Sequence, residues 1–254
     1  MNMRRPSRAR QRGLSLIESM VALVLTLALI AGVAQMLVGT QGNIRNQNDR
    51  SSMDDEARFA VEYLSRAGFR AGFKRSTEID NDMVFPEVNN SFPKEAVVFG
   101  TDTTLSLRYQ GHADGQMATC HNDAADQTNN PFGVYVETWS LNNNALRCAL
   151  TQPDGTQSTE PLSNNVEAIR FQYGVVTVQG GDYPDTYRNA ADMTATDWEK
   201  VRSVVIGLRL VSTNDNLAET PQPYIDFDGN SATPNDRRLR RTVFTTVALR
   251  NLLP

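Results

Sequence analysis

The chain has 254 residues, of which 25 are basic and 29 acidic, and its formal net charge is −4. This balance argues against a general nucleic-acid binder. Two histidines and two cysteines leave little material for a metal centre or for histidine-based catalysis. The sequence has no nucleophile elbow, no phosphate-binding glycine loop after a strand and no ligand-spaced carboxylate pair, so the usual motifs of acyl transfer, phosphoryl transfer and metal-dependent hydrolysis are missing. The scattered acidic residues are compatible with a glycosidase, because that activity needs only two suitably placed carboxylates.

The first thirteen residues carry five arginines and no acidic residue, and they end in Gly13. An apolar run of twenty-five residues follows, from Leu14 to Val38. A secretory signal has a shorter apolar stretch of about 7–15 residues and a small-residue cleavage site after it. Basic residues mark the cytoplasmic flank of a membrane helix. The pattern therefore predicts a helix that spans the inner membrane, with the rest of the chain exported.

One carboxylate, Glu18, lies near the start of this apolar run. A charged side chain in the bilayer core costs roughly 2.5–3.5 kcal/mol on insertion scales, so such groups usually have a partner. We therefore expect Glu18 to pair with a cation. The alternative is a plain signal anchor in which Glu18 lies near the interface and is solvated.

The basic leader, Gly13, and an apolar helix with glutamate as its fifth residue together resemble a class III prepilin signal. This signal marks type IV pilins and the pseudopilins of type II secretion. The resemblance implies that a prepilin peptidase cuts between Gly13 and Leu14 and methylates the amino group of Leu14. It also implies that Glu18 pairs with the α-amino group of a neighbouring subunit in a filament. Without the leader, 20 basic and 29 acidic residues would remain, a net charge near −9.

Two departures point away from a major pilin. Leu14 stands where most members of the family have Phe or Met, and residues 14–70 contain no proline. Residues 39–70 are compatible with a continuation of the helix, because small and apolar residues recur at helical spacing. These residues are expected to pack on a globular domain: Ala57, Ala60, Val61, Leu64, Ala67 and Gly68. The charged residues expected to face water are Asp54, Asp55, Glu56, Glu62 and Arg66.

Gly39 and Gly42 are weak points of this long helix, and the alternative is two separate helices broken there. Residues 71–254 are long enough for one head domain with its own core. Its predicted strands are rich in β-branched and aromatic residues and cover 96–99, 104–109, 134–141, 145–151, 166–176, 201–211 and 242–249. Asn142, Asn143 and Asn144 predict a hairpin turn. Residues 177–200 and 213–237 are polar and predicted as loops.

The predicted fold class is therefore α+β, with a long N-terminal helix packed on a mainly antiparallel β head. The segments expected are a cleaved leader, 1–13, a membrane helix, 14–38, its amphipathic continuation, 39–70, and a periplasmic head, 71–254. Cys120 and Cys148 are the only cysteines. Since an exported domain enters an oxidising space, an even pair is most simply a disulfide. A zinc site that uses the adjacent His121 is the less favoured reading, because the only further histidine is His112.

Two charged clusters need a separate interpretation. Arg237, Arg238, Arg240 and Arg241 have no interleaved aromatic residues, so a solvated strand start is favoured over a DNA-binding surface. The segment from Asp226 to Asn230 is faintly similar to a calcium loop. Because it lacks the usual distal glutamate, an ordinary Asx-rich loop is favoured.

The C-terminal region resembles minor pilins of the PilW type, in the segment Trp198-Glu-Lys-Val201 and in Arg241-Thr-Val-Phe-Thr-Thr-Val-Ala-Leu-Arg-Asn251. To a lesser degree it resembles the J-type minor pseudopilin. The resemblance implies a structural subunit that helps to prime and assemble type IV pili at the filament tip. Its partners would be other minor pilins, the major pilin, the prepilin peptidase and the inner membrane. No cofactor, nucleic acid or small-molecule substrate is expected.

Three alternatives remain beside this prediction. They are a J-type pseudopilin of type II secretion, an adhesive or DNA-binding tip module, and a membrane-anchored periplasmic hydrolase.

Overall fold

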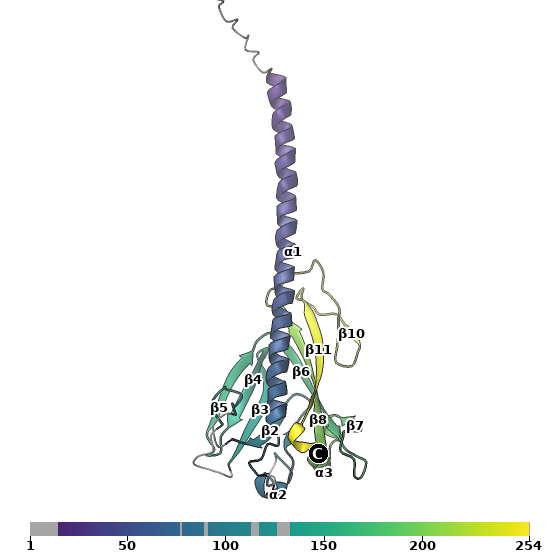
Figure 1. Cartoon of the computed structure of the whole chain (residues 1–254). Helices are drawn as coiled ribbons and strands as arrows, with labels where there is room; N and C mark the ends of the chain where they lie inside the picture. Colours follow the sequence, from purple (N-terminus) through teal and green to yellow (C-terminus); the bar gives the residue numbers. More distant parts are fainter. Residues whose placement is uncertain (1–14, 77, 89–90, 113–116, 126–132, 254) are drawn as a thin grey trace, which may run out of the picture. The chain divides into compact units, whose positions relative to one another are not determined.

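The computed structural model describes residues 15–76, 78–88, 91–112, 117–125 and 133–253 (Figure 1). The contacts within the chain define two units, residues 1–47 and residues 48–254. The long helix α1, Leu16–Arg70, contributes to both units. It continues through Gly39 and Gly42, so the alternative with a helix break at these glycines is not observed.

The α1 residues of the first unit expose their apolar side chains. Leu16 is 80% exposed, and large apolar residues along the helix as far as Val38 are more than half exposed. By length and composition this part of α1 could cross a membrane. A helix that is apolar all round requires lipid or protein around it.

The second unit, the head, contains two antiparallel sheets. The first has the strand order β1-β2-β3-β4-β5. Its strands are β1 (Val98–Gly100), β2 (Leu105–Gln110), β3 (Val134–Asn142), β4 (Ala145–Thr151) and β5 (Gln157–Ser163). The second has the order β11-β8-β6-β7. Its strands are β6 (Val166–Val175), β7 (Thr186–Arg188), β8 (Val201–Val211) and β11 (Arg240–Ala248).

Smaller elements connect these strands. A two-stranded hairpin is formed by β9 (Tyr224–Ile225) and β10 (Ser231–Ala232). The short helices are α2 (Asn81–Val84) and α3 (Ala195–Glu199), and the 3₁₀ turns are η1 (Ala190–Asp192) and η2 (Arg250–Leu252). The predicted α+β class is confirmed.

All seven predicted strands are present, and β4 and β8 have the predicted bounds. The asparagine turn is confirmed as well: Asn143 and Asn144 have φ values of 52° and 58°, the left-handed pair of a type I′ hairpin. The prediction of plain loops at 177–200 and 213–237 was wrong, because the first contains β7 and α3 and the second contains β9 and β10. Strands of two or three residues are too short to give a period-two signal.

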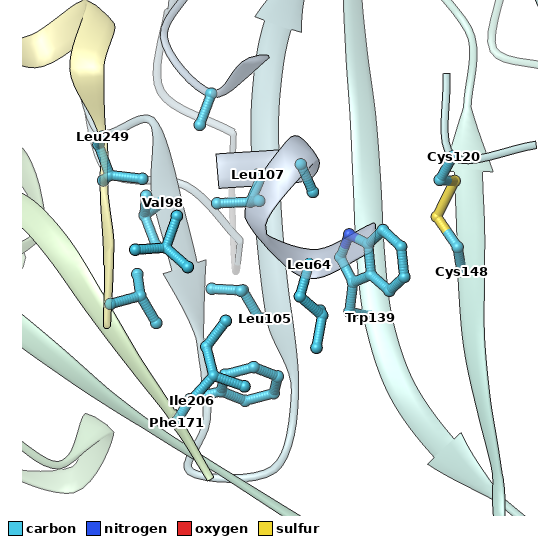
Figure 2. Packing of buried hydrophobic residues seen from close by; sticks show 14 of the residues in the cluster. Leu64, Val98, Leu105, Leu107, Cys120, Trp139, Cys148, Phe171, Ile206 and Leu249 are labelled. Atoms are coloured by element: carbon cyan, nitrogen blue, oxygen red, sulfur yellow. A yellow bond between two sulfur atoms is a disulfide. The ribbon is translucent and has the colours of Figure 1, made fainter. Parts of the chain in front are cut away.

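The core lies between the last five turns of α1 and the two sheets. One cluster of buried residues includes α1, β2, β3, β6 and β8, and Figure 2 shows Leu64 of α1 beside Leu105 and Trp139. The predicted inward face of α1 is confirmed, with Asp49 and Met53 added and Val61 only partly buried. Its small residues let strands approach closely: a Cβ on Gly68 would collide with Cγ1 of Val247 in β11.

Two carboxylates that were predicted to face water also contact strands or loops of the head. The Glu56 side chain accepts hydrogen bonds from the Ser163 hydroxyl, at 2.7 Å, and from the Asn164 backbone amide, at 2.5 Å. Asp54 forms an ion pair with Arg241. The helix pattern alone did not reveal these contacts, because their partners come from distant strands.

Candidate functional site

The predicted processing site and the predicted assembly contact lie at the start of α1. Gly13 and Leu14 fall outside the residues that the structure describes. Glu18 lies in the first turn of α1, and its backbone amide donates to the Ser15 carbonyl at 3.1 Å and approaches the Ser15 hydroxyl at 3.3 Å. Ser15 thus caps the helix. The order Ser-x-x-Glu is a capping-box sequence and could have predicted this cap. This cap was not among the predictions from the sequence.

Glu18 is exposed and forms no ion pair with any described residue. Its charge lies at one end of a helix segment whose remaining surface is mostly apolar and carries no other charge as far as Val38. In a bilayer or in a helical filament core, such a carboxylate is costly unless a cation from another molecule meets it. The geometry is therefore suited to a contact between subunits.

A buried polar network fixes the other end of α1. Nη2 of Arg70 donates to Oε1 and Oε2 of Glu137 at 2.8 and 2.7 Å. The same Oε1 accepts from the Tyr109 hydroxyl at 2.6 Å and from the Cys120 backbone amide at 2.8 Å. The carboxylate is completely buried, and these donors satisfy its charge.

Burial and charge shift the titration of this network. Burial alone would lower the pKa of Arg70, but the Glu137 carboxylate outweighs that effect and raises it. Burial, reinforced by the charge of Glu137, raises the pKa of Tyr109 well above its ordinary value. Arg70 therefore stays charged and Tyr109 stays a hydrogen-bond donor at any physiological pH, so the network serves as a structural lock.

The two cysteines form a disulfide, Cys120–Cys148, with Cα atoms 6.4 Å apart. It connects the segment before β3 to strand β4. The neighbouring His121 lies close to both sulfur atoms, but its Nε2 is 3.0 Å from the Cys148 carbonyl oxygen and its Nδ1 is 3.2 Å from the Ser158 hydroxyl. Since the disulfide removes both thiolates, this cluster offers one imidazole to a metal ion, where zinc prefers about four ligands.

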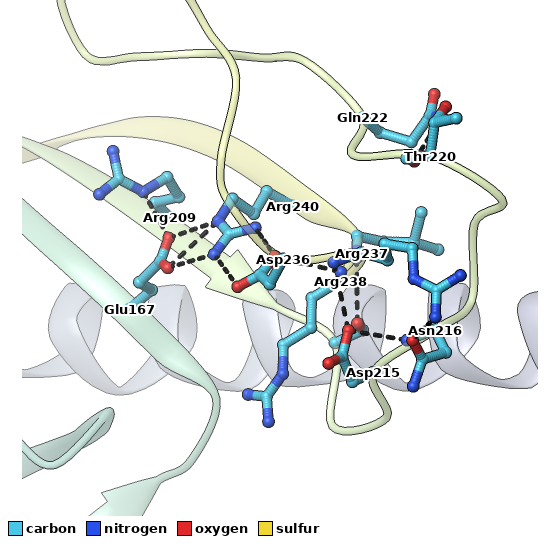
Figure 3. A network of polar contacts seen from close by, with 12 residues as sticks. Glu167, Arg209, Asp215, Asn216, Thr220, Gln222, Asp236, Arg237, Arg238 and Arg240 are labelled. Atoms are coloured by element: carbon cyan, nitrogen blue, oxygen red, sulfur yellow. Dashed lines mark hydrogen bonds and ion pairs between the residues drawn. The ribbon is translucent and has the colours of Figure 1, made fainter.

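The arginine cluster lies at the start of β11, and two of its four members, Arg240 and Arg241, form ion pairs. Figure 3 shows Arg240 between Glu167 and Asp236, which it contacts at 2.8 and 2.6 Å, and only 7% of its side chain is exposed. The prediction of a solvated strand start was therefore wrong for Arg240, because Glu167 on β6, two strands away in the same sheet, compensates its charge. Arg241 pairs with Asp54, and Arg237 donates to the Asn216 side chain.

The carboxylates around Arg240 respond as an ion-pair network requires. The hydrogen bond from Arg240 lowers the pKa of Asp236 to about 2. Burial would raise the pKa of Glu167, but its hydrogen bonds with Arg240 and Arg209 lower it. The hydrogen bonds that Arg240 donates to Asp236 and Glu167 raise the pKa of Arg240.

The faint calcium motif folds as an Asx-rich turn, as favoured. Oδ1 of Asp226 accepts the backbone amides of Asp228 and Asn230, and Gly229 takes a φ of 82°. The Asp228 carboxylate pairs with Arg170. The acidic groups of this turn thus bind the protein itself.

A second buried cation was not anticipated. Arg108 of β2 donates to the carbonyl oxygens of Phe85, Pro86, Pro93 and Ala96 and lies over the rings of Phe85 and Phe92. Burial lowers its pKa to about 10. It fixes the loop between α2 and β1.

Comparison with known families matches two parts of the chain. A family described as Type IV Pilus-assembly protein W matches residues 134–251, which run from β3 to the C-terminal turn η2. A prokaryotic N-terminal methylation motif matches residues 8–34, a range that contains Gly13, Leu14 and Glu18. No protein of curated function matches the chain.

Among solved structures, the chain is similar to the type IV-like pilin TTHA1219 from Thermus thermophilus. The two share 18% sequence identity, and the alignment covers 79% of this chain and 98% of that one, with a TM-score of 0.44.

Proposed function

We propose that this protein, a minor pilin of the PilW type in type IV pili, helps to prime pilus assembly and occupies the filament tip. Its N-terminal apolar helix and methylation motif fit a membrane-anchored pilin with a C-terminal soluble head. The observation that supports this proposal most directly is the position of Glu18. Its carboxylate lies at the end of an exposed apolar helix and pairs with no cation of the described residues.

The proposed maturation begins with removal of residues 1–13. A prepilin peptidase would cut between Gly13 and Leu14 and methylate the new amino group, which lies four residues before Glu18. In the assembled filament this amino group would meet Glu18 of a neighbouring subunit. The pair stabilises the assembled filament only, because in the unassembled membrane form the unpaired Glu18 carboxylate is unfavourable in free energy.

The proposed partners are other minor pilins and the major pilin, with the inner membrane as the place of assembly. The head would lie in the periplasm before assembly and outside the cell afterwards. We propose no catalytic role. Two of the arginines that could have contacted DNA instead form ion pairs within the protein, Arg240 with Glu167 and Asp236 and Arg241 with Asp54. This argues against a DNA-binding tip.

The experiment compares cells that lack the protein with cells that carry a Glu18→Ala copy. The variant should insert and be processed, because the leader and the cleavage site are intact, but it should be poorly recruited into filaments or into complexes with other minor pilins. Surface pili are counted by electron microscopy, and recruitment is measured by co-purification.

A Glu62→Ala copy is the matched control, since Glu62 lies on the exposed face of the head part of α1 and, among the described residues, forms an ion pair with Arg66 alone. Normal piliation with Glu18→Ala, in cells where deletion abolishes pili, would contradict the proposed contact. Normal piliation after deletion would contradict the role in pilus assembly itself.

A further inference from the structure

The outer edge of β11 presents an unoccupied row of backbone groups. β11 is the last strand in the order β11-β8-β6-β7 and pairs with β8 along its whole length. The amide of Leu249 donates to the Arg202 carbonyl, and that of Ser212 donates to the Leu239 carbonyl. Because hydrogen-bonded pairs alternate in an antiparallel ladder, the odd-numbered residues of β11 bond to β8. The residues that turn their amides and carbonyls to the open edge are Arg240, Thr242, Phe244, Thr246 and Ala248.

This edge lacks the protection found at the other sheet ends. β1 and β7 have three residues each, and β5 contains Glu160 and Pro161, which discourage pairing with a further strand. β11 has nine residues, and from Thr242 to Val247 it consists of β-branched and aromatic residues. A long unprotected edge of this composition is a template for another strand.

The β9–β10 hairpin approaches the start of this edge. The Thr242 hydroxyl donates to the Ile225 carbonyl at 2.6 Å, and the ring of Phe227 lies 6.0 Å from that of Phe244. Phe244 is nevertheless 57% exposed, and Thr246 and Ala248 are exposed. A further strand would cover the Phe244 ring.

A groove accompanies this edge on the side of α1. Its volume is about 180 Å³, and it is lined by Asp54, Ala57, Arg58, Val61, Arg241 and Val243. A hollow of about 420 Å³ shares Asp54 and Arg241 with it and adds Arg50. Asp54 pairs with Arg241, whereas Arg50 and Arg58 form no ion pair with the described residues. The groove therefore has a positive excess and suits an acidic segment.

We propose that β11 binds an extended acidic segment of another pilin subunit, which adds to the sheet as a fifth strand and places a carboxylate near Arg58. The identity of the partner as a pilin rests on the proposed function. Backbone hydrogen bonds along the edge supply affinity, and contacts of alternate side chains with Phe244 and the groove supply selectivity.

The test removes one outward amide from the edge. Thr246→Pro deletes an N–H that makes no bond within the sheet, whereas Thr246→Ala keeps it. Each full-length variant is expressed in a pilus-forming host that lacks the wild-type copy, and the other minor pilins and the major pilin that co-purify in detergent are quantified by mass spectrometry. We expect recovery to fall about tenfold with Thr246→Pro and to stay within about twofold with Thr246→Ala.

Amide hydrogen exchange identifies the contact as strand addition. In the isolated full-length protein the outward amides of Phe244, Thr246 and Ala248 should exchange quickly, and in the complex slowly. Equal exchange of these amides in both states overturns the proposal, as does wild-type recovery with Thr246→Pro. Slow exchange in the isolated protein together with dimer formation would mean that a second copy occupies the edge, which also overturns it.

Charge reversal gives an independent readout if Thr246→Pro disturbs folding. Arg58→Glu should lower recovery of the partner pilins about tenfold, and Arg75→Glu, an equal charge change at an exposed site away from the groove, should leave it unchanged. Equal recovery with both variants contradicts the proposal. Normal pili with Thr246→Pro and Arg58→Glu, in a host where deletion abolishes pili, would overturn strand addition and leave the minor-pilin role intact. Normal pili after deletion would overturn that role.

Discussion

The Glu137 carboxylate and the Arg70 guanidinium form an ion pair at 2.7 Å with no exposed surface on the carboxylate, which ties the last residue of α1 to the middle of β3. Through Oε1 the same carboxylate binds the backbone amide of Cys120, one end of the disulfide. The helix, the first sheet and the disulfide segment therefore meet at one buried charge.

Replacement of this charge should destabilise the head strongly. Glu137→Gln leaves Arg70 as an uncompensated buried cation, so we expect the free energy of unfolding to fall by about 2–4 kcal/mol. Glu62→Gln, which alters the exposed pair with Arg66, should change it by less than about 1 kcal/mol. Tryptophan fluorescence during denaturation of the full-length protein in detergent measures both, since Trp139 and Trp198 are buried in the head. Equal effects of the two variants would contradict the lock.

Two glycines of α1 should respond in opposite directions to alanine. Gly68→Ala places a methyl group against Val247, and we expect a loss of about 1–3 kcal/mol. Gly42→Ala meets open space and gains helix propensity, so it should be neutral or stabilise the helix by up to about 1 kcal/mol. Thermal denaturation followed by circular dichroism compares the two. A neutral Gly68→Ala would show that β11 does not pack on α1 as described.

The disulfide should be protected and stabilising. Cys120 and Cys148 should resist alkylation until reductant is added. In the chain-entropy model, closure of a loop of this size contributes about 3–4 kcal/mol, so Cys148→Ser should lower the thermal midpoint of the head. Intact mass after alkylation, with and without reductant, measures the first effect. Alkylation without reductant, in protein purified from the exported compartment, would contradict the pairing.

Acid should weaken the head through the pair of Asp236 with Arg240. The pKa of Asp236 is lowered to about 2 by the hydrogen bond from Arg240. A carboxyl whose pKa is lower in the folded state contributes stability above its unfolded value, about 3.9, and loses it as the pH falls to the folded value. Wild type should therefore be more stable than Asp236→Asn at pH 6, and the difference should vanish between about pH 4 and pH 2.

Denaturation midpoints across this pH range provide the measurement, with Asp55→Asn as the control. Asp55 is an exposed aspartate on α1 with no ion pair in the part of the chain that the structure describes. Comparison of the two variants separates the effect of the ion pair from the effect of a lost surface charge. A constant difference for Asp236→Asn between pH 6 and pH 2 would contradict a contribution from the charged pair.

The apolar pattern predicted the main strands and the inward face of α1 because both follow directly from burial periodicity. The burial of Glu137 could also have been predicted from this periodicity. Glu137 shares the inward face of β3 with Tyr135 and Trp139, so period two places it in the core. The pairing of Glu137 with Arg70 could not be predicted, because contact between residues 67 positions apart depends on how α1 packs against the sheet.

The sequence pattern predicted the wrong environment for Arg240 and did not predict β5, and the physical reasons differ. The arginine run suggested solvent, but Glu167 on β6 and Asp236 compensate the buried charge of Arg240. β5 is an edge strand with exposed polar residues and Pro161, so it shows neither apolar alternation nor high β propensity.

The mature amino terminus provides the most direct test of the pilin assignment. Intact mass and terminal sequencing of the protein purified from membranes should show a chain that begins at Leu14 with a methylated amino group. The bulky Gly13→Val variant should retain residues 1–13, because the peptidase requires a small residue at the cut. A wild-type protein that keeps its leader, or that begins at any residue other than Leu14, would contradict processing as a pilin and remove the amino group proposed to meet Glu18.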